Sequence, residues 1–266
     1  MAKCVIVVLC SLAMSFSQFA ALGLSCAENS SQIDVRSRFR IDNCLVVGDK
    51  VTKSVTIFYD GLVYDCIGDY GQITIYDKTA GTLLLLDPSS RLKTLVTAEN
   101  LAEDFMRRRE VFRKSDNPFL NYLADPFFEE NAYEGNSGLM YFCSPWVEYR
   151  FETVTLNDPI VSEAYYDFCQ QFTLLNIRTN GSPTPMIRHE LNPVIAQNQR
   201  FPGKVNMTLY PQGKVIISRR AIHAETTHTF VRRLQSPDEA RVEQANRYRN
   251  QFREVSLDDY LREVNR

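Results

Sequence analysis

Three histidines are the residues of this 266-residue chain best suited to acid–base or metal chemistry. His189 stands beside Glu190 in a proline-rich stretch, whereas His223 and His228 flank Glu225 near an expected turn. A zinc site needs three or four ligands, and no further ligand stands close to this pair in the sequence. We therefore interpret His223 and His228 as exposed residues at strand ends and predict no metal site.

Carboxylates offer a second route to chemistry, because two acids at a defined separation hydrolyse glycosidic bonds. Five aspartates recur in a short part of the chain, but most stand in sequences typical of turns, where the side chain bonds its own backbone. We assign them no catalytic role. They are Asp60, Asp65, Asp69, Asp77 and Asp87.

Motifs for a nucleophile or a cofactor are missing from the sequence. The Gly-x-Ser-x-Gly turn of Ser-His-acid hydrolases is absent, and Gly135-Asn136-Ser137-Gly138 is too short to replace it. The chain also lacks a P-loop, a dinucleotide glycine fingerprint, an EF-hand loop and a Cys-x-x-Cys pair. The sequence favours a protein that is not an enzyme and that uses no cofactor.

Residues 1–27 have the pattern of a secretory signal peptide. Lys3 precedes an apolar stretch from Val5 to Leu24, and small residues end at Ala27, where we predict cleavage. An uncleaved anchor is one alternative, because ~20 apolar residues are enough to span a bilayer as a helix. A lipid-modified Cys26 is another. We predict export to the periplasm, the cell envelope or the extracellular space.

Export changes what the cysteines can do. Of the seven cysteines, three leave with the signal peptide. The four that remain could form two disulfides in three connectivities in an oxidising compartment. Proximity in the sequence favours Cys44 with Cys66 and Cys143 with Cys169. The alternative is that some of them are buried thiols that pack as small hydrophobic groups.

Length and charge restrict the class of protein further. Residues 28–266 are enough for a single exported domain with a substantial core, and 44% of the chain is hydrophobic. Thirty basic and 32 acidic side chains give a formal charge of −2. Such a balance provides no field that would hold a polyanion, so we predict no nucleic-acid partner.

The stretch from Val51 to Ser90 predicts a β-meander. Asp60-Gly61 is a dipeptide that readily adopts the positive φ angles of a tight hairpin, and the later connections are equally short. Such connections join antiparallel neighbours, because a parallel return needs a crossover. The expected strands are Val55–Tyr59, Leu62–Ile67, Gln72–Tyr76 and Thr82–Leu86.

Residues 97–203 predict a helical insertion, after which strands return. Thr97 is the expected cap of one helix, and Asp158-Pro159 the expected start of another. Proline-rich residues 179–203 predict an irregular connection. Strands are expected near Leu139–Cys143, Val147–Val154 and between Val205 and Leu234, and a terminal helix pair starts at Ser236 and Ser256.

KSVTIFYDGLVYDC, followed by GQITIYDKTAGTLLLLDPSS and by returning strands, resembles the LolA/LppX-like lipoprotein-carrier superfamily. The resemblance covers Val51–Ser90 and, more loosely, Val205–Leu234, as a rhythm of strands and turns. It implies an α+β fold in which helices cover a curved antiparallel sheet, an open half-barrel. It also implies binding of lipid or lipoprotein outside the cytoplasm.

Two functional hypotheses follow from the export signal and the aromatic-rich strands. The first is a non-enzymatic carrier or sensor of a hydrophobic small molecule or lipoprotein acyl chain, bound in the concavity of the sheet. Association with a membrane surface is compatible with it, and the oligomeric state is left open. The second is a cell-envelope scaffold or interaction module with a filled core.

Overall fold

The computed structural model describes residues 38–68, 71–135, 137–179, 184–211, 213 and 221–264. The expected cleavage at Ala27 lies outside these ranges. Within them, no helix is both long and apolar enough to cross a membrane.

One large open sheet organises the described residues. It runs in the order β12-β6-β5-β4-β3-β2-β1-β11-β10-β9-β8-β7 and does not close into a barrel. The predicted α+β class with a largely antiparallel sheet is confirmed, but the sheet is mixed, because β12 pairs with β6 in parallel. The strands are β1 (Phe39–Val47), β2 (Lys50–Tyr59), β3 (Leu62–Ile67), β4 (Ile73–Asp77), β5 (Thr82–Asp87), β6 (Leu92–Thr97), β7 (Glu130–Glu134), β8 (Leu139–Cys143), β9 (Val147–Thr155), β10 (Arg200–Leu209), β11 (Ile222–Val231) and β12 (Arg253–Glu254).

The predicted meander forms as consecutive antiparallel neighbours from β2 to β5. Asp60 and Gly61 both have positive φ, 50° and 80°, as expected for the tight hairpin. The strand that continues the meander, β6, was not predicted. β6 follows β5 and pairs with it from Leu92 to Thr97, with Leu92 and Val96 buried.

Several helices begin at residues whose side chains accept hydrogen bonds from the first backbone amides. They are α1 (Ala98–Arg113), α2 (Pro118–Ala124), α3 (Pro159–Thr179), α4 (Pro185–Gln197), α5 (Ser236–Gln251) and α6 (Leu257–Val264). Thr97 accepts a hydrogen bond from Asn100 N at 3.2 Å, and Asp158 from Ile160 N at 3.1 Å. Both predicted caps are confirmed.

The cap of α5 differs from the prediction. Gln235, not Ser236, is the N-cap, and Asp238, not Glu239, closes the capping box by accepting from Gln235 N at 2.8 Å. Asp238 also accepts hydrogen bonds from Arg40 of β1 at 2.9 Å. The capping residue therefore stands one position before the serine, and a tertiary contact fixes the acid that completes the box.

The expected irregular connection over residues 179–203 is wrong, because most of it is α4. Prolines suggested a break, but Pro185 stands in the first turn, where its missing amide matters little. Pro193 lies inside the helix, which is kept by burial of Ile187, Leu191 and Ile195.

The segment 97–203 is also not purely helical. It supplies β7, β8 and β9, which continue the sheet beyond β10 to its end.

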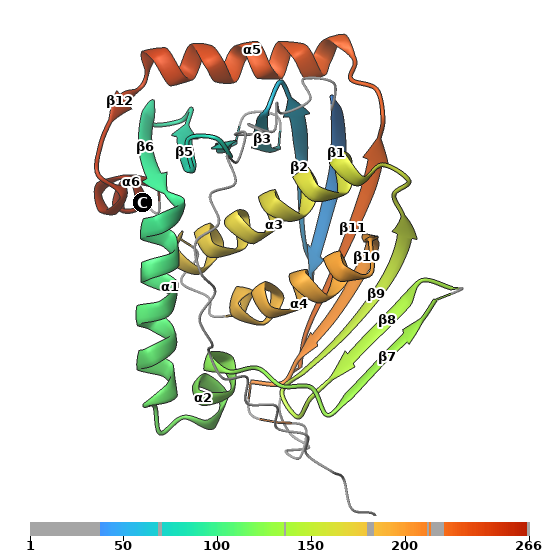
Figure 1. Cartoon of the computed structure of the whole chain (residues 1–266). Coiled ribbons are helices and arrows are strands. Elements are labelled where there is room, and N and C mark those ends of the chain that lie inside the picture. Colours follow the sequence, from blue (N-terminus) through green and yellow to red (C-terminus); the bar gives the residue numbers. More distant parts are fainter. Residues whose placement is uncertain are drawn as a thin grey trace, which may run out of the picture. The chain divides into compact units, whose positions relative to one another are not determined.

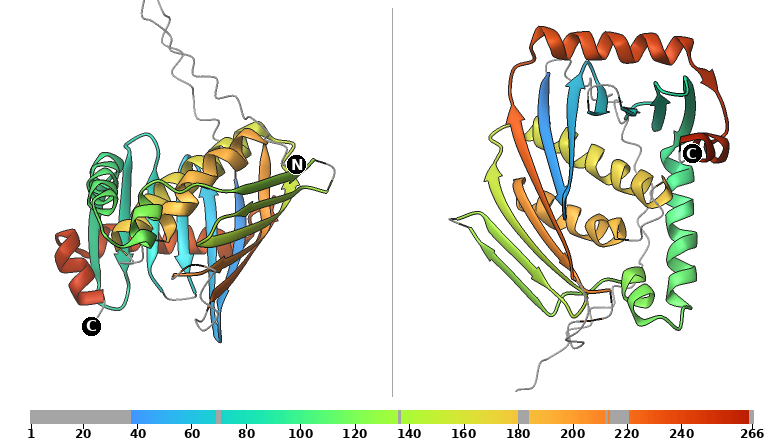
Figure 2. Two further views of the ribbon diagram at one scale, coloured as in Figure 1. Left: turned by 90° about the horizontal axis from the view of Figure 1, so that it is seen from below. Right: turned by 180° about the vertical axis from the view of Figure 1, so that it is seen from behind.

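Helices cover both faces of the sheet. α3 and α4 lie side by side across one face (Figure 1), and in the view from behind the strands lie nearer the viewer than these two helices (Figure 2). On the opposite face, Val242, Ala245 and Phe252 of the α5 segment pack against a separate cluster that includes Ile57 and Tyr64. Since residues alternate between faces along a strand, β2 contributes to both cores.

Candidate functional site

A hollow of ligand size lies at the β7–β8 end of the sheet, on the face that α3 and α4 cover. This edge groove has a volume of about 420 Å³ and is lined by α4, residues 126–128 and strands β7 and β8. Its size falls in the range of small-molecule sites, roughly 300–1,000 Å³. Its apolar lining includes Phe127, Phe128, Met140, Phe142, Leu191 and Val194.

Aromatic contacts hold the walls of the edge groove in place. The rings of Phe128 and Phe142 meet at 5.4 Å, and Phe142 meets Phe151 at 5.9 Å, both edge-on. Phe127 remains 53% exposed although it touches Tyr122. A large apolar side chain that stays in solvent beside a groove is suited to close over an apolar ligand.

Several polar groups at the groove already have partners. Glu190 of α4 lies 3.4 Å from Arg109 and 3.8 Å from His189 Nδ1. His189 and then Arg109 hold the pKa of Glu190 below its usual value, against the effect of burial. Arg200 donates to the Tyr133 hydroxyl at 2.8 Å. The groove therefore favours an apolar ligand portion.

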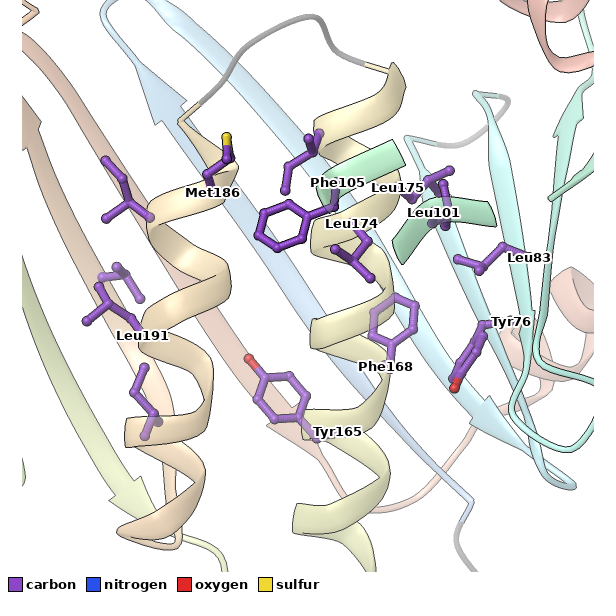
Figure 3. Packing of buried hydrophobic residues seen from close by; sticks show 14 of the residues in the cluster. Tyr76, Leu83, Leu101, Phe105, Tyr165, Phe168, Leu174, Leu175, Met186 and Leu191 are labelled. Atoms are coloured by element: carbon purple, nitrogen blue, oxygen red, sulfur yellow. The ribbon is translucent and has the colours of Figure 1, made fainter. Parts of the chain in front are cut away.

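The centre of the helix–sheet interface is filled. Figure 3 shows Phe168 of α3 beside Tyr76 of β4, with a ring separation of 6.3 Å, and Tyr165 further along the same helix. Phe168 meets Phe58 of β2 at 6.0 Å between ring centres. Side chains thus occupy the middle of this interface, and the hollow lies at its end.

A row of polar side chains crosses the same face beneath α3. Thr56 donates to Asp65 at 2.6 Å, and Asn43 Nδ2 donates to Thr56 at 2.9 Å. His228 Nδ1 lies 2.7 Å from Asn43 Oδ1, so Nδ1 carries the proton toward the amide oxygen. The row forms because Thr56 pairs with Asp65, and Asn43 with His228, across adjacent strands.

Burial shifts the pKa values of Asp65 and His228, the two residues at the ends of this row. It raises the pKa of Asp65 to about 6, although the Thr56 hydroxyl acts in the opposite direction. It lowers the pKa of His228 to about 4, and the positive charge of Arg188 adds to that effect. Each shift disfavours the charged form, as burial does.

These positions confirm one sequence interpretation and correct another. Asp65 lies inside β3, within the expected strand Leu62–Ile67, and is 4% exposed. His228 lies within β11, half-buried, rather than exposed at a strand end, whereas His223 is exposed, near Thr208 at 3.1 Å. His228 stands five positions after His223, an odd number, so the two lie on opposite faces of the strand.

The four cysteines within the described residues form no disulfide. The expected pairing of Cys44 with Cys66 is wrong, because β2 separates their strands and two strand spacings, roughly 10 Å, exceed disulfide reach. No disulfide joins Cys143 to Cys169 either. Burial raises the pKa of Cys66 to about 12 and of Cys169 to about 11, so both pack as neutral, unreactive groups.

Arg188 of α4 is the residue of this region that sequence reasoning missed. Its Cζ lies 4.8 Å from the centre of the Phe151 ring, and its Nη1 is buried without a hydrogen-bond partner. The apolar residues at 187, 191 and 195 carry a helical spacing that could have placed Arg188 on a packed helix. The four prolines obscured it.

Comparison with known proteins assigns no family: no protein-family model matches the chain, and no curated protein matches its sequence. Among the residues with described positions, no three His, Cys, Asp or Glu side chains gather into a metal-binding group.

Proposed function

We propose that this protein is an exported, non-enzymatic carrier or sensor of a hydrophobic ligand, such as a lipid or a lipoprotein acyl chain. The observation that supports the proposal is the edge groove, because its volume and its apolar lining suit a hydrocarbon chain. A half-barrel form of the sheet, with the ligand on its covered face, belongs to the same proposal. The ligand then lies at the β7–β8 end and not in the filled centre.

Filling the groove tests the proposal. Val194 is a half-buried residue of the groove wall, and Val194→Trp places an indole in the space meant for the ligand. We expect the wild-type chain to take up Nile red or a fluorescent fatty acid, and V194W to lose most of that uptake. Native mass spectrometry of protein purified from its own host should show bound lipid.

A matched control is Val154→Trp, because Val154 is 50% exposed on β9 and is not among the residues that line the edge groove. V154W should retain the uptake of the wild type. Repeated purification without lipid, together with no uptake by the wild type, would contradict the proposed function.

The filled centre favours a second candidate, a scaffold or interaction protein of the cell envelope. A solid interface such as that of Phe58, Tyr76 and Phe168 stabilises a fold without holding a ligand. Crosslinking in cells should then recover a reproducible protein partner. Recovery of self-contacts alone would remove the support for this candidate.

A further inference from the structure

Arg188 is a partly buried cation with no carboxylate beside it. Its guanidinium lies against the ring of Phe151, which is 0% exposed. Nη1 is buried without an acceptor, and no ion pair among the described residues includes Arg188. Arginine is always charged, and a buried charge without a partner is unfavourable. Such a group calls for an explanation.

Arg188 lies behind the inner wall of the edge groove and does not itself line it. The Phe151 ring that it contacts lies 5.9 Å from the ring of Phe142, a residue of the groove wall. Met140, which also lines the groove, is the cross-strand partner of Phe151. The positive charge is therefore one aromatic side chain away from the wall of the groove.

The other cations near the groove already have partners. Arg109 pairs with Asp125 at 2.7 Å and with Glu190 at 3.4 Å. Arg200 donates to Thr155 at 2.9 Å, in addition to Tyr133. Among these three arginines, Arg188 alone has its charge available to a ligand.

Neighbouring groups do not supply the missing negative charge. Burial raises the pKa of Tyr149 to about 12 and that of Cys169 to about 11, against the pull of Arg188 in both cases. Burial also raises the pKa of Tyr165 well above its ordinary value. All three groups are neutral at physiological pH.

We propose that Arg188 binds the carboxylate of a long-chain fatty acid whose hydrocarbon chain lies in the edge groove. This inference rests on the proposed function and names the polar end of the ligand. The fork of a guanidinium donates to both oxygens of a carboxylate, and the apolar surroundings strengthen that contact. Lipids without an anionic head fill the groove but leave Arg188 unpaired.

Displacement of Nile red from the wild-type chain tests this, because the probe is neutral. At slightly alkaline pH we expect palmitic acid to displace the dye at about tenfold lower concentration than methyl palmitate, since a hydrogen bond to a charged group contributes ~1.5–3 kcal/mol. Arg188→Gln should weaken displacement by the acid about tenfold and leave the ester unchanged. R188K should lie between, because lysine lacks the fork.

Arg150→Gln is the matched control, because Arg150 is exposed on β9 and lies on the face opposite Phe151. R150Q should bind both lipids as the wild type does. Equal displacement by acid and ester from the wild type would overturn the inference, as would an R188Q that weakens both equally. A wild type that takes up neither dye nor lipid would instead refute the proposed function, and the inference with it.

Discussion

Two arginines on opposite faces of the sheet show how differently its two layers are built. On the α5 face, Arg40 donates to Asp238 at 2.9 Å and lies 3.0 Å from Asp42. Asp238 is fully buried and also caps α5. On the α4 face, Arg188 lies over the ring of Phe151 and forms no ion pair among the described residues.

The difference separates a layer whose cation is paired with carboxylates from the layer in which we propose that a ligand binds. On the α5 face, buried Asp238 neutralises Arg40 and caps α5, although Arg40 Nε is itself buried without a hydrogen bond. On the α4 face, Arg188 has no ion pair within the part of the chain that the structure describes and lies behind the wall of an open apolar groove. Unsatisfied polar groups are expected where a protein meets another molecule.

The largest effect on stability should come from removing the carboxylate of Asp238 on the α5 face. Asp238→Ala leaves Arg40 partly buried without its partner and removes the capping box, so we expect the free energy of unfolding to fall by about 3 kcal/mol. Urea unfolding measures this. Glu243→Gln, on the exposed side of the same helix, should change little, and an equal loss in both variants would contradict the assigned role of Asp238.

An intermediate effect concerns pH and the polar row. Asp65 has a folded pKa of about 6, above its ordinary 3.8, so its contribution to stability is full at low pH and is lost as pH rises from about 4 to 6. His228 has a folded pKa of about 4, below 6.5, so its contribution is present at neutral pH and is lost as pH falls through the same window. The two contributions oppose each other.

Single substitutions separate the contributions of Asp65 and His228 to stability. As pH rises from about 4 to 6, the stability of Asp65→Asn relative to the wild type should increase by about 2 kcal/mol, and that of His228→Gln should decrease by a similar amount. Unfolding free energies across this pH range measure both differences. Two difference curves of the same sign would show that the row does not titrate in this way.

The smallest effect tests Arg188 without any ligand. Arg188→Met in delipidated protein removes an unpaired cation and keeps similar volume, so stability should rise by about 1 kcal/mol. Arg40→Met should instead lower it, because Asp238 loses its partner. Thermal or urea unfolding of the two variants gives the comparison, and a loss of stability in R188M would remove the contrast between the layers.

Local signals predicted those parts of the fold that local chemistry determines. Asp60-Gly61 forms its hairpin, and Thr97 and Asp158 cap their helices as expected. The N-cap of α5 is Gln235 and not the predicted Ser236, and the Asp238 that completes its capping box is held by Arg40, which lies 198 positions away in the chain. Such a contact leaves no trace in the sequence near the helix.

The candidate site was less predictable for the same reason. Asp65 resembles the turn aspartates around it, and only cross-strand pairing with Thr56 shows that it is buried. Arg188 becomes notable only once α4 lies on β9 and β10. The prolines near it suggested a loop, although Pro193 is tolerated within a helix that buries its other face.

The two outer strands of the sheet also affect how copies of this chain meet. β12 shields β6 at one border, but β7 presents five exposed residues and an unpaired row of backbone amides and carbonyls at the other. Glu130 and Glu134 begin and end that strand. Their like charges repel an incoming copy and so discourage strand-to-strand aggregation at the border that flanks the groove.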